Sequence, residues 1–353
     1  MEALKRPNWD FSEKRDEKLL WLDKNECNYK SVKSFIREIY KSIDINSLST
    51  YPDLSDIYCL FNSVFNIKND RSFLTYGSDG AIKAFFEFCN SKSKKPRALL
   101  MRPTFGMYEV YARYYCASVS FFDYGKFTKD FNIDINSLVE EIDQLNEGDI
   151  FVLANPESPL GFLYEEKQLI TLIDKCLEKK IFFLLDETYM GFSKAPYSHR
   201  DLIELNLSNV FLTGSLSKSW GLAGVRLGYL VSSKENVEDA KLTRFMYEIG
   251  GLQSEILKSC LENHSVFEKL LSEQIKNRED FIHILRHNNF DAINTSTNFI
   301  HISRKSLKGS SLTNLADICI FKQIKHSSLA HLIRLTMPDP VDFDIILAAL
   351  KKQ

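Results

Sequence analysis

A lysine, an arginine and several serines lie close together in residues 213–228 of this 353-residue chain. Lys218 stands between two serines, and Arg226 follows it on the carboxyl side. A lysine amine can form a covalent bond with a carbonyl carbon, and hydroxyl groups with an arginine fork can hold phosphate oxygens. The pattern predicts a site for a cofactor that carries an aldehyde and a phosphate; the alternative is a polar loop with a solvated lysine. The candidate ligands are Lys218, Ser215, Ser217 and Arg226.

Apolar runs on both sides of this stretch, residues 210–212 and 229–231, predict buried strands. A third run, residues 181–185, is continuously apolar, which is typical of a parallel strand covered on both faces, and it ends at Asp186. Burying a carboxylate costs free energy unless a cation meets it. Asp186 is therefore a candidate for binding a cationic ring nitrogen, or alternatively a cap for the following loop.

A glycine turn precedes the helix predicted at residues 81–89. The first backbone amides of a helix have no partner inside the helix, and its amino end carries partial positive charge. The turn contains Gly77, Ser78 and Asp79, and it is a candidate second half of the phosphate site; the alternative is an ordinary helix cap. The chain lacks a Gly-x-Gly-x-x-Gly pattern, which argues against dinucleotide binding.

Five further segments carry motifs. They are Leu22-Asp23-Lys24-Asn25-Glu26, Tyr51-Pro52, Pro103-Thr104-Phe105-Gly106-Met107-Tyr108, Asn155-Pro156-Glu157-Ser158-Pro159-Leu160-Gly161 and Ile333-Arg334-Leu335-Thr336. Together with Asp186, Tyr189 and the stretch around Lys218, they follow the order found in fold-type I pyridoxal-phosphate (PLP) enzymes. From about residue 22 to its last helix, the chain resembles the class I and II aminotransferases, and among them the histidinol-phosphate aminotransferases.

The resemblance assigns a role to each residue around the cofactor. Lys218 would hold PLP covalently and move a proton, Asp186 would bind the pyridine nitrogen, and Tyr189 would bind the 3-oxygen. Tyr108 would stack on the ring, with packing in the core as the alternative. Ser158 stands where the family has an asparagine that binds the 3-oxygen, and serine can donate the same bond with a shorter side chain.

The resemblance also implies how a substrate and a second subunit contribute. Arg334 would bind the substrate carboxylate or phosphate, with a structural ion pair as the alternative, and Asn25 belongs to the arm that borders the substrate pocket. Tyr51 matches a tyrosine that reaches the cofactor phosphate of the other subunit, which implies a homodimer with shared active sites. The family's second arginine falls on Phe321, and residues 306–331 align poorly, so the resemblance does not identify the substrate.

Composition and charge argue against several classes of protein. Hydrophobic residues make up 44% and charged residues 26% of the chain, as in ordinary globular proteins. A net charge of −2 offers no electrostatic reason to expect nucleic acid or a membrane surface as a partner, and no apolar run approaches the roughly 20 residues that span a bilayer. The seven scattered cysteines, without a Cys-x-x-Cys pair, indicate reduced thiols in a cytoplasmic protein and no metal site.

We expect an α/β fold, and the resemblance implies fold type I with a mixed, mostly parallel seven-stranded sheet. A large PLP-binding domain would span residues 40–235 and a small α+β domain residues 236–353, which an N-terminal arm at residues 1–39 would join. Residues 234–261 are amphipathic but interrupted by two glycines, and they resemble the long helix that connects the two domains.

The resulting expectation is a PLP-dependent aminotransferase. It would move an amino group between glutamate or 2-oxoglutarate and a small amine or ketone, with a phosphorylated one expected. Two alternatives stay open. One is a PLP-dependent decarboxylase of a phosphorylated amino acid, which would break a different bond at the substrate α-carbon. The other is a non-catalytic binding protein of the same fold.

Overall fold

A seven-stranded sheet lies at the centre of the computed structural model, which describes residues 15–68, 70–193 and 208–352. Its strand order is β2-β8-β7-β6-β5-β3-β4, and only β8 runs antiparallel to its neighbours. The strands are β2 (Ser72–Tyr76), β3 (Arg97–Arg102), β4 (Ser118–Asp123), β5 (Ile150–Ala154), β6 (Phe182–Asp186), β7 (Val210–Ser215) and β8 (Leu227–Val231). The prediction of a mixed, mostly parallel seven-stranded sheet is confirmed.

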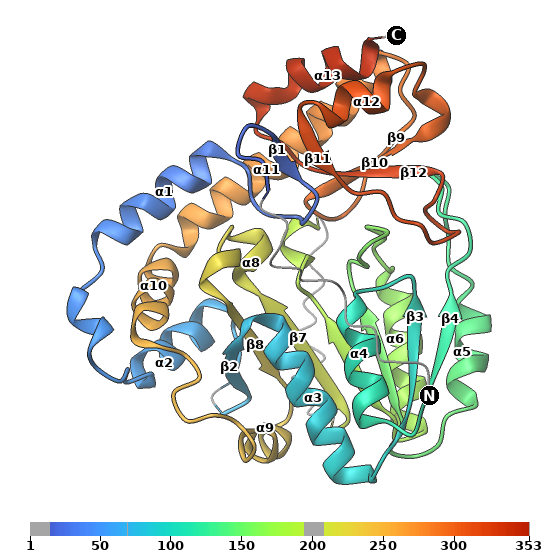
Figure 1. Cartoon of the computed structure of the whole chain (residues 1–353). Helices are drawn as coiled ribbons and strands as arrows, with labels where there is room; N and C mark the ends of the chain where they lie inside the picture. Colours follow the sequence, from blue (N-terminus) through green and yellow to red (C-terminus); the bar gives the residue numbers. More distant parts are fainter. Residues whose placement is uncertain (1–14, 69, 194–207, 353) are drawn as a thin grey trace.

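Helices cover both faces of this sheet (Figure 1). Phe151 of β5 packs into a core on one face, and Val152, the next residue, packs into a core on the other. Successive strand side chains point to opposite faces, so a strand buried on both faces must be apolar throughout. The first core includes α5 (Ile135–Asp143) and α6 (Glu166–Glu178), and the second includes α3 (Gly77–Ser93), α4 (Gly106–Tyr115) and α9 (Lys234–Lys241).

A second group of elements, mostly C-terminal, lies at one end of the large sheet (Figure 1). Its three strands are antiparallel in the order β12-β10-β9. The N-terminal strand β1 pairs with β11 in parallel, and the buried Leu22 of β1 packs into the core of this group. The pairing agrees with the predicted role of the N-terminal arm, while the domain boundaries stay a prediction. The elements are β1 (Leu20–Leu22), α11 (His264–His287), β9 (Ala292–Ile293), β10 (Phe299–Ser303), α12 (Ser311–Ala316), β11 (Cys319–Phe321), β12 (Leu332–Thr336) and α13 (Phe343–Lys351).

Two separate helices replace a single connecting helix at residues 234–261. Helix α9 ends at Lys241, and α10 (Gly251–Glu262) begins after the N-cap residue Gly250. A side chain at Gly251 would come within 2.0 Å of the Ser47 carbonyl oxygen, so only glycine allows this close backbone approach. Helices α1 (Lys30–Lys41) and α2 (Ser55–Val64) contribute to the same core as α10. No helix in the described ranges is long and apolar enough to cross a membrane.

Candidate active site

A cavity of about 550 Å³ lies where the carboxyl ends of the parallel strands face the C-terminal group of elements. Ligand sites of open α/β sheets form at this edge because loops from several strands converge there. All the predicted site residues except Tyr51 and Gly77 line the cavity. They are Asn25, Ser78, Asp79, Tyr108, Ser158, Asp186, Tyr189, Ser215, Ser217, Lys218, Arg226 and Arg334.

Lys218 reaches the cavity from α8 (Leu216–Ser219), the short helix that directly follows β7. The Ser215 hydroxyl caps this helix by accepting a hydrogen bond from the Ser217 amide at 3.1 Å. The Lys218 Nζ donates to the Lys24 carbonyl oxygen at 3.1 Å, and no acidic side chain of the described residues pairs with it. The amine is therefore placed to react with a carbonyl compound in the cavity.

The predicted phosphate site brings together two segments that are far apart in the sequence. Strands β2 and β8 pair with Tyr76 opposite Leu227, and the Gly77 amide donates to the Arg226 carbonyl oxygen at 3.0 Å. Gly77 has a φ of +68°, and a side chain there would come within 2.6 Å of the Arg226 guanidinium. The positive φ favours glycine at this position. The guanidinium consequently lies beside the first turn of α3, where unpaired amides favour an anion.

Asp186 ends β6 as a buried acid with 5% of its surface exposed. Its Oδ2 accepts a hydrogen bond from the Tyr108 hydroxyl at 2.6 Å, and its Oδ1 accepts one from the Thr188 amide at 2.9 Å. Burial raises the pKa of this carboxyl, because no cation of the described residues pairs with it. Tyr108 both lines the cavity and packs in the core, since only 1% of its surface is exposed.

Asn25 connects the N-terminal segment to Tyr189, which is predicted to bind the 3-oxygen of the cofactor. Its backbone amide donates to the Thr336 hydroxyl at 3.0 Å, and its side-chain amide donates to the Tyr189 hydroxyl at 2.7 Å. Asn25 and Tyr189 are both buried at the cavity wall. Ser158 lines the same cavity. Another predicted residue, Asp79, accepts a hydrogen bond from the Tyr111 hydroxyl at 3.1 Å.

Arg334 is a buried arginine in β12 with 8% of its surface exposed. Its Nη2 donates to the Asp23 backbone oxygen at 2.7 Å, and its Nε has no hydrogen-bond partner in the described part of the chain. The Asp23 carboxylate pairs instead with Arg15 at 2.9 Å, and no acidic side chain of the described ranges pairs with Arg334. Burial lowers the pKa of Arg334. The arrangement supports an anion-binding role over the structural ion pair that the sequence left open.

Glu157 is a functional candidate that the sequence analysis quoted within a motif but did not single out. Its side chain is fully buried, and its two oxygens accept hydrogen bonds at 2.9 Å from the hydroxyls of Thr104 and Tyr124. Burial raises its pKa to about 8. Its partner Thr104 lines the cavity, and so does Ser158, the residue that follows Glu157 in the chain. Glu157 therefore supports the cavity wall at two places. Its place in the Asn-Pro-x-x-Pro motif was a signal that could have identified it.

His301 is a second residue that the sequence did not reveal. Its Nε2 lies 2.9 Å from the Leu160 carbonyl oxygen and 3.1 Å from the Pro159 carbonyl oxygen, in the loop that carries Ser158. Burial lowers its pKa to about 3, so the ring is neutral. No local pattern around His301 signals this contact, because the loop lies about 140 residues earlier in the chain.

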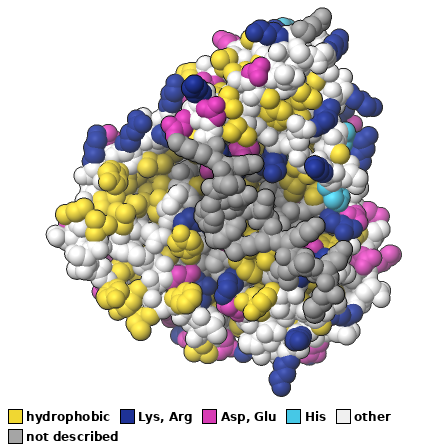
Figure 2. Space-filling view, in the orientation of Figure 1, with side chains coloured by type: hydrophobic (Ala, Val, Ile, Leu, Met, Phe, Trp, Pro, Cys, Tyr) yellow, Lys and Arg dark blue, Asp and Glu magenta, His cyan; other side chains and the backbone are white. Residues whose placement is uncertain are grey.

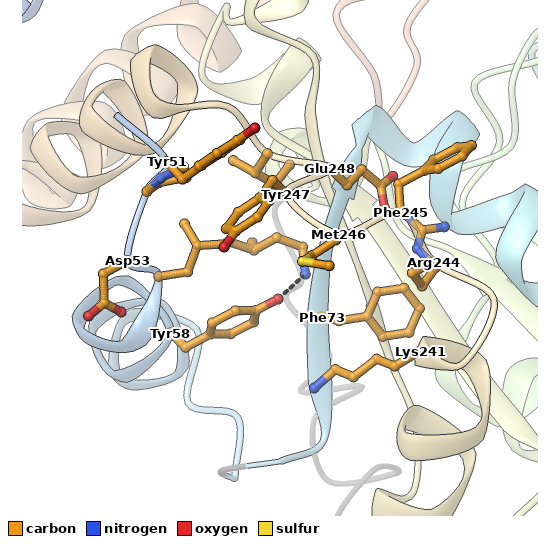
Figure 3. Close-up of a pocket in the computed structure, with 14 residues that line it drawn as sticks. Tyr51, Asp53, Tyr58, Phe73, Lys241, Arg244, Phe245, Met246, Tyr247 and Glu248 are labelled. Carbon is orange, nitrogen blue, oxygen red and sulfur yellow. Dashed lines mark hydrogen bonds and ion pairs between the residues drawn. The ribbon is translucent and has the colours of Figure 1, made fainter. Parts of the chain in front are cut away.

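Tyr51 lies outside the cavity, in a second pocket of about 690 Å³ (Figure 3). Its ring stacks on Tyr247 with a centroid distance of 4.2 Å, and 78% of its surface is exposed. Exposed apolar side chains surround it, including Phe245 and Met246, each with 82% of its surface exposed. Within one chain, Tyr51 therefore does not contribute to the cavity that contains Lys218.

The donors around the cavity fit the predicted cofactor. The Lys218 amine suits its aldehyde, and the site formed by Arg226 and the start of α3 suits its phosphate. Asp186 is a buried acid that lacks a cation among the described residues, and it suits a protonated ring nitrogen. The Tyr108 side chain adds an aromatic surface at the same wall.

Comparison with known proteins agrees with this fit. A family model described as "Aminotransferase class I and II" matches residues 17–350. The histidinol-phosphate aminotransferase of Brachyspira hyodysenteriae is 26% identical over 349 residues, which cover 96% of this chain and 93% of that protein.

Two solved structures show the same fold. The histidinol-phosphate aminotransferase from Sinorhizobium meliloti, in complex with pyridoxal-5'-phosphate, has a TM-score of 0.76 and 17% identity, and the match covers 94% of this chain and 90% of that chain. The L-threonine-O-3-phosphate decarboxylase from Porphyromonas gingivalis has a TM-score of 0.75 and 18% identity, with 94% and 98% covered.

The family match spans nearly the whole chain. It confirms the predicted fold type, the predicted enzyme class and PLP as the cofactor. The fold alone would also accommodate a decarboxylase, since the Porphyromonas enzyme shares it. The family match shows that the chain belongs to the class I and II aminotransferases.

Proposed function

We propose that this enzyme moves an amino group between glutamate or 2-oxoglutarate and a small amine or ketone, with a phosphorylated compound expected. One observation carries the proposal. The Lys218 amine and the buried Arg334 guanidinium line the same cavity, and no acidic side chain of the described residues neutralises either group. A reactive amine with a nearby unpaired guanidinium suits a substrate that carries both an amino group and an anion. The similarity to a histidinol-phosphate aminotransferase makes phosphorylated amines the first class to test.

PLP, when bound, supplies an aldehyde that condenses with amines and a ring that accepts electrons from the substrate. Asp186 would keep a proton on the ring nitrogen, because a hydrogen bond to a buried charged group contributes about 1.5–3 kcal/mol. Tyr189 and Ser158 would bind the 3-oxygen, and Tyr108 would pack on the ring. The residues assigned to the phosphate are Gly77, Ser78, Asp79, Ser215, Ser217 and Arg226.

Lys218 would carry out the proton transfers. Its Nζ, as a free amine, would accept the proton from the substrate α-carbon and donate it to the C4′ carbon of the cofactor. Arg334 would hold the substrate carboxylate, which orients the bond between the α-carbon and its hydrogen. Asn25 would position Tyr189 through the hydrogen bond at 2.7 Å and border the substrate pocket.

We also propose a homodimer in which each active site receives Tyr51 from the other subunit. Tyr51 is exposed and lies outside the cavity of its own chain. The neighbouring Leu242, Phe245 and Met246 each have 82% of their surface exposed. A contiguous apolar surface of this kind marks a protein interface. Two subunits would associate through this surface, so that Tyr51 of one subunit reaches the cofactor phosphate of the other.

We place the enzyme in the cytoplasm. Its seven cysteines are all free, as expected in a reducing compartment. Its partners there would be a small amino donor and a keto acceptor.

The proposal is tested by a single turnover of the holoenzyme with glutamate. We expect the cofactor absorbance to change and one equivalent of 2-oxoglutarate to be released for each active site. A panel of other amino donors, including small phosphorylated amines, would then identify the second substrate. If no donor yields a keto product while a phosphorylated amino acid yields carbon dioxide, the enzyme is a decarboxylase.

Arg334→Ala tests the substrate-binding assignment. Truncating one partner of a desolvated charge pair costs about 2–5 kcal/mol, so glutamate should bind more than tenfold more weakly. The surface variant Arg113→Ala, which removes only an exposed pair with Glu109, serves as the control. Unchanged glutamate affinity in Arg334→Ala would show that another group binds the carboxylate.

A further inference from the structure

His301 of β10 contacts the loop that follows β5 and carries Ser158. Its Nε2 lies 2.9 Å from the Leu160 carbonyl oxygen and 3.1 Å from the Pro159 carbonyl oxygen. A carbonyl oxygen only accepts hydrogen bonds, so Nε2 carries the proton and donates to both oxygens. His301 and Leu160 are buried, with 1% and 0% of their surface exposed. The histidine ring therefore supplies a hydrogen bond that a buried backbone carbonyl needs.

The same loop packs tightly against the segment that precedes β10. The Ser296 amide donates to the Gly161 carbonyl oxygen at 2.9 Å. A side chain at Gly161, which has a φ of +83°, would come within 2.4 Å of the Thr295 Cβ atom. These contacts fix the far end of the loop, whereas His301 holds the two residues that directly follow Ser158.

Arg334 lies on the neighbouring strand, opposite His301 in the register of β10 and β12. Its guanidinium donates to the Asp23 carbonyl oxygen and lies over the Phe299 ring, 5.0 Å from the ring centroid. Burial, together with the positive charge of Arg334, lowers the pKa of His301 to about 3. The ring is therefore neutral, and its Nδ1 has no hydrogen-bond partner among the described residues. Such a ring is suited to holding carbonyl oxygens through Nε2 and not to binding an anion.

The position of Ser158 determines whether its hydroxyl reaches the cofactor. Ser158 and Pro159 both line the cavity. Serine has a shorter side chain than the asparagine found here in the family, so it has less reach with which to compensate for a shift of the loop. Because Ser158 directly precedes Pro159, a shift of the Pro159 backbone would move the serine relative to the cofactor.

We propose that His301 is a positioning residue for the cofactor, which holds the loop where the Ser158 hydroxyl can donate to the 3-oxygen of PLP. This inference rests on the proposed function, which assigns Ser158 to the 3-oxygen, and deepens it. His301 is not among the described residues that line the cavity, so it acts through the loop and does not touch the cofactor.

The pH dependence of the visible absorbance of bound PLP tests this role. A donor to the 3-oxygen stabilises negative charge on that oxygen, so it favours the deprotonated form of the bound cofactor and lowers the cofactor pKa. His301→Leu should therefore raise this pKa by about 0.5–1 pH unit, the equivalent of one net hydrogen bond. His301→Gln should keep the wild-type value, because the glutamine amide can donate from about the place of Nε2.

His331→Leu is the matched control. The Nε2 of His331 lies 2.8 Å from the Phe127 carbonyl oxygen, which is outside the Ser158 loop. Its removal deletes a similar contact between a histidine and a backbone oxygen, and it should leave the cofactor pKa unchanged.

A double-mutant cycle separates this role from a general structural one. If His301 acts through Ser158, the double variant His301→Leu/Ser158→Ala should have the same cofactor pKa as Ser158→Ala alone. If His301→Leu does not fold, His301→Asn takes its place in the cycle, because the shorter amide does not reach the two carbonyl oxygens.

Three results would overturn the proposal. They are additive shifts in the double variant, an unchanged cofactor pKa in either single variant, and a value for His301→Gln that equals that of His301→Leu. All these measurements need bound PLP but no substrate. They are therefore independent of whether glutamate donates its amino group, which the single-turnover experiment decides.

Discussion

Among the described residues, the Lys218 amine has one hydrogen-bond partner, the Lys24 carbonyl oxygen, which leaves it open to the cofactor aldehyde. We expect borohydride reduction of the holoenzyme to fix the cofactor to Lys218, because reduction makes the bond between amine and aldehyde permanent. Peptide mass mapping would locate the adduct, and Lys218→Ala should give none. An adduct on any other lysine of the wild-type protein would contradict the assignment.

A second prediction at the scale of single residues is that Glu157 makes the stability of the protein depend on pH. Its pKa rises from the usual 4.5 to about 8 in the folded protein, because burial disfavours the charged carboxylate. Between these values the folded protein keeps a proton that the unfolded chain has released. The group therefore favours folding fully below pH 4.5, and this contribution is lost as the pH rises through about 8.

Glu157→Gln should remove this dependence, because glutamine does not titrate and still accepts a hydrogen bond. Between pH 5 and pH 8, the free energy of unfolding of the wild-type protein should fall relative to that of Glu157→Gln. Each pH unit accounts for at most about 1.4 kcal/mol. Urea unfolding followed by circular dichroism measures the difference. Parallel curves for the two proteins would show that Glu157 is ionised in the folded state.

At the scale of elements, the pairing of β2 with β8 would build the proposed phosphate site. Gly228 of β8 lies against the start of α3, and a side chain there would come within 2.3 Å of the Gly77 carbonyl carbon and 2.4 Å of the Ser78 amide nitrogen. Both contacts are to backbone atoms, which cannot move without shifting the strand or the helix.

Gly228→Ala should therefore destabilise the protein by about 1–3 kcal/mol, as overpacking does, and weaken PLP binding. Urea unfolding of the apoprotein and spectroscopic titration with PLP measure the two effects. Gly224→Ala is a matched control in the short 3-10 helix Ala223–Val225, because a side chain there meets no atom of the described residues within 4 Å. Equal effects of the two substitutions would show that the close contact at Gly228 determines neither the stability of the protein nor its affinity for PLP.

At the scale of the whole molecule, the proposed homodimer predicts complementation between two inactive variants. Tyr51→Ala should lack the tyrosine that each subunit lends to its partner, and Lys218→Ala should lack the reactive amine. A mixed dimer would contain one intact site, with Lys218 from one subunit and Tyr51 from the other. Mixing the variants after subunit exchange should therefore restore amino transfer from glutamate.

Two results would argue against shared sites. One is normal PLP affinity in Tyr51→Ala, and the other is the absence of restored activity in the mixture. Each variant alone, taken through the same exchange procedure, is the control. The exposed side chains that surround Tyr51 in Figure 3 would form the surface through which the two subunits associate.

At the scale of the whole molecule, charged side chains do not gather at one place on the face that Figure 2 shows. Lysine and arginine side chains are scattered over this face (Figure 2). The net charge is only −2, so the molecule as a whole has no strong electrostatic field of one sign. Anion binding at the proposed active site would depend on individual residues such as Arg226 and Arg334, and not on the overall charge.

The sequence by itself determined the cofactor, through its resemblance to a known family, and with it the residues expected around the cofactor. Lys218, Asp186 and Tyr189 belong to short motifs at the ends of apolar runs, and such local patterns reflect the chemistry that each strand end must support. The parallel strands were predictable for a different reason, because strands covered on both faces are apolar throughout. Tyr108 was only half predictable, because it lines the cavity and packs in the core at the same time.

Only the tertiary structure decided which distant residues complete the substrate side of the cavity. Lys322 lines the cavity, and a backbone bridge holds it opposite Arg334. His301 meets the Pro159 loop, and Glu157 meets Thr104, through packing between segments that are far apart in sequence. Spacing along a chain encodes strands and helices, but the register between remote segments depends on how all of their side chains pack together.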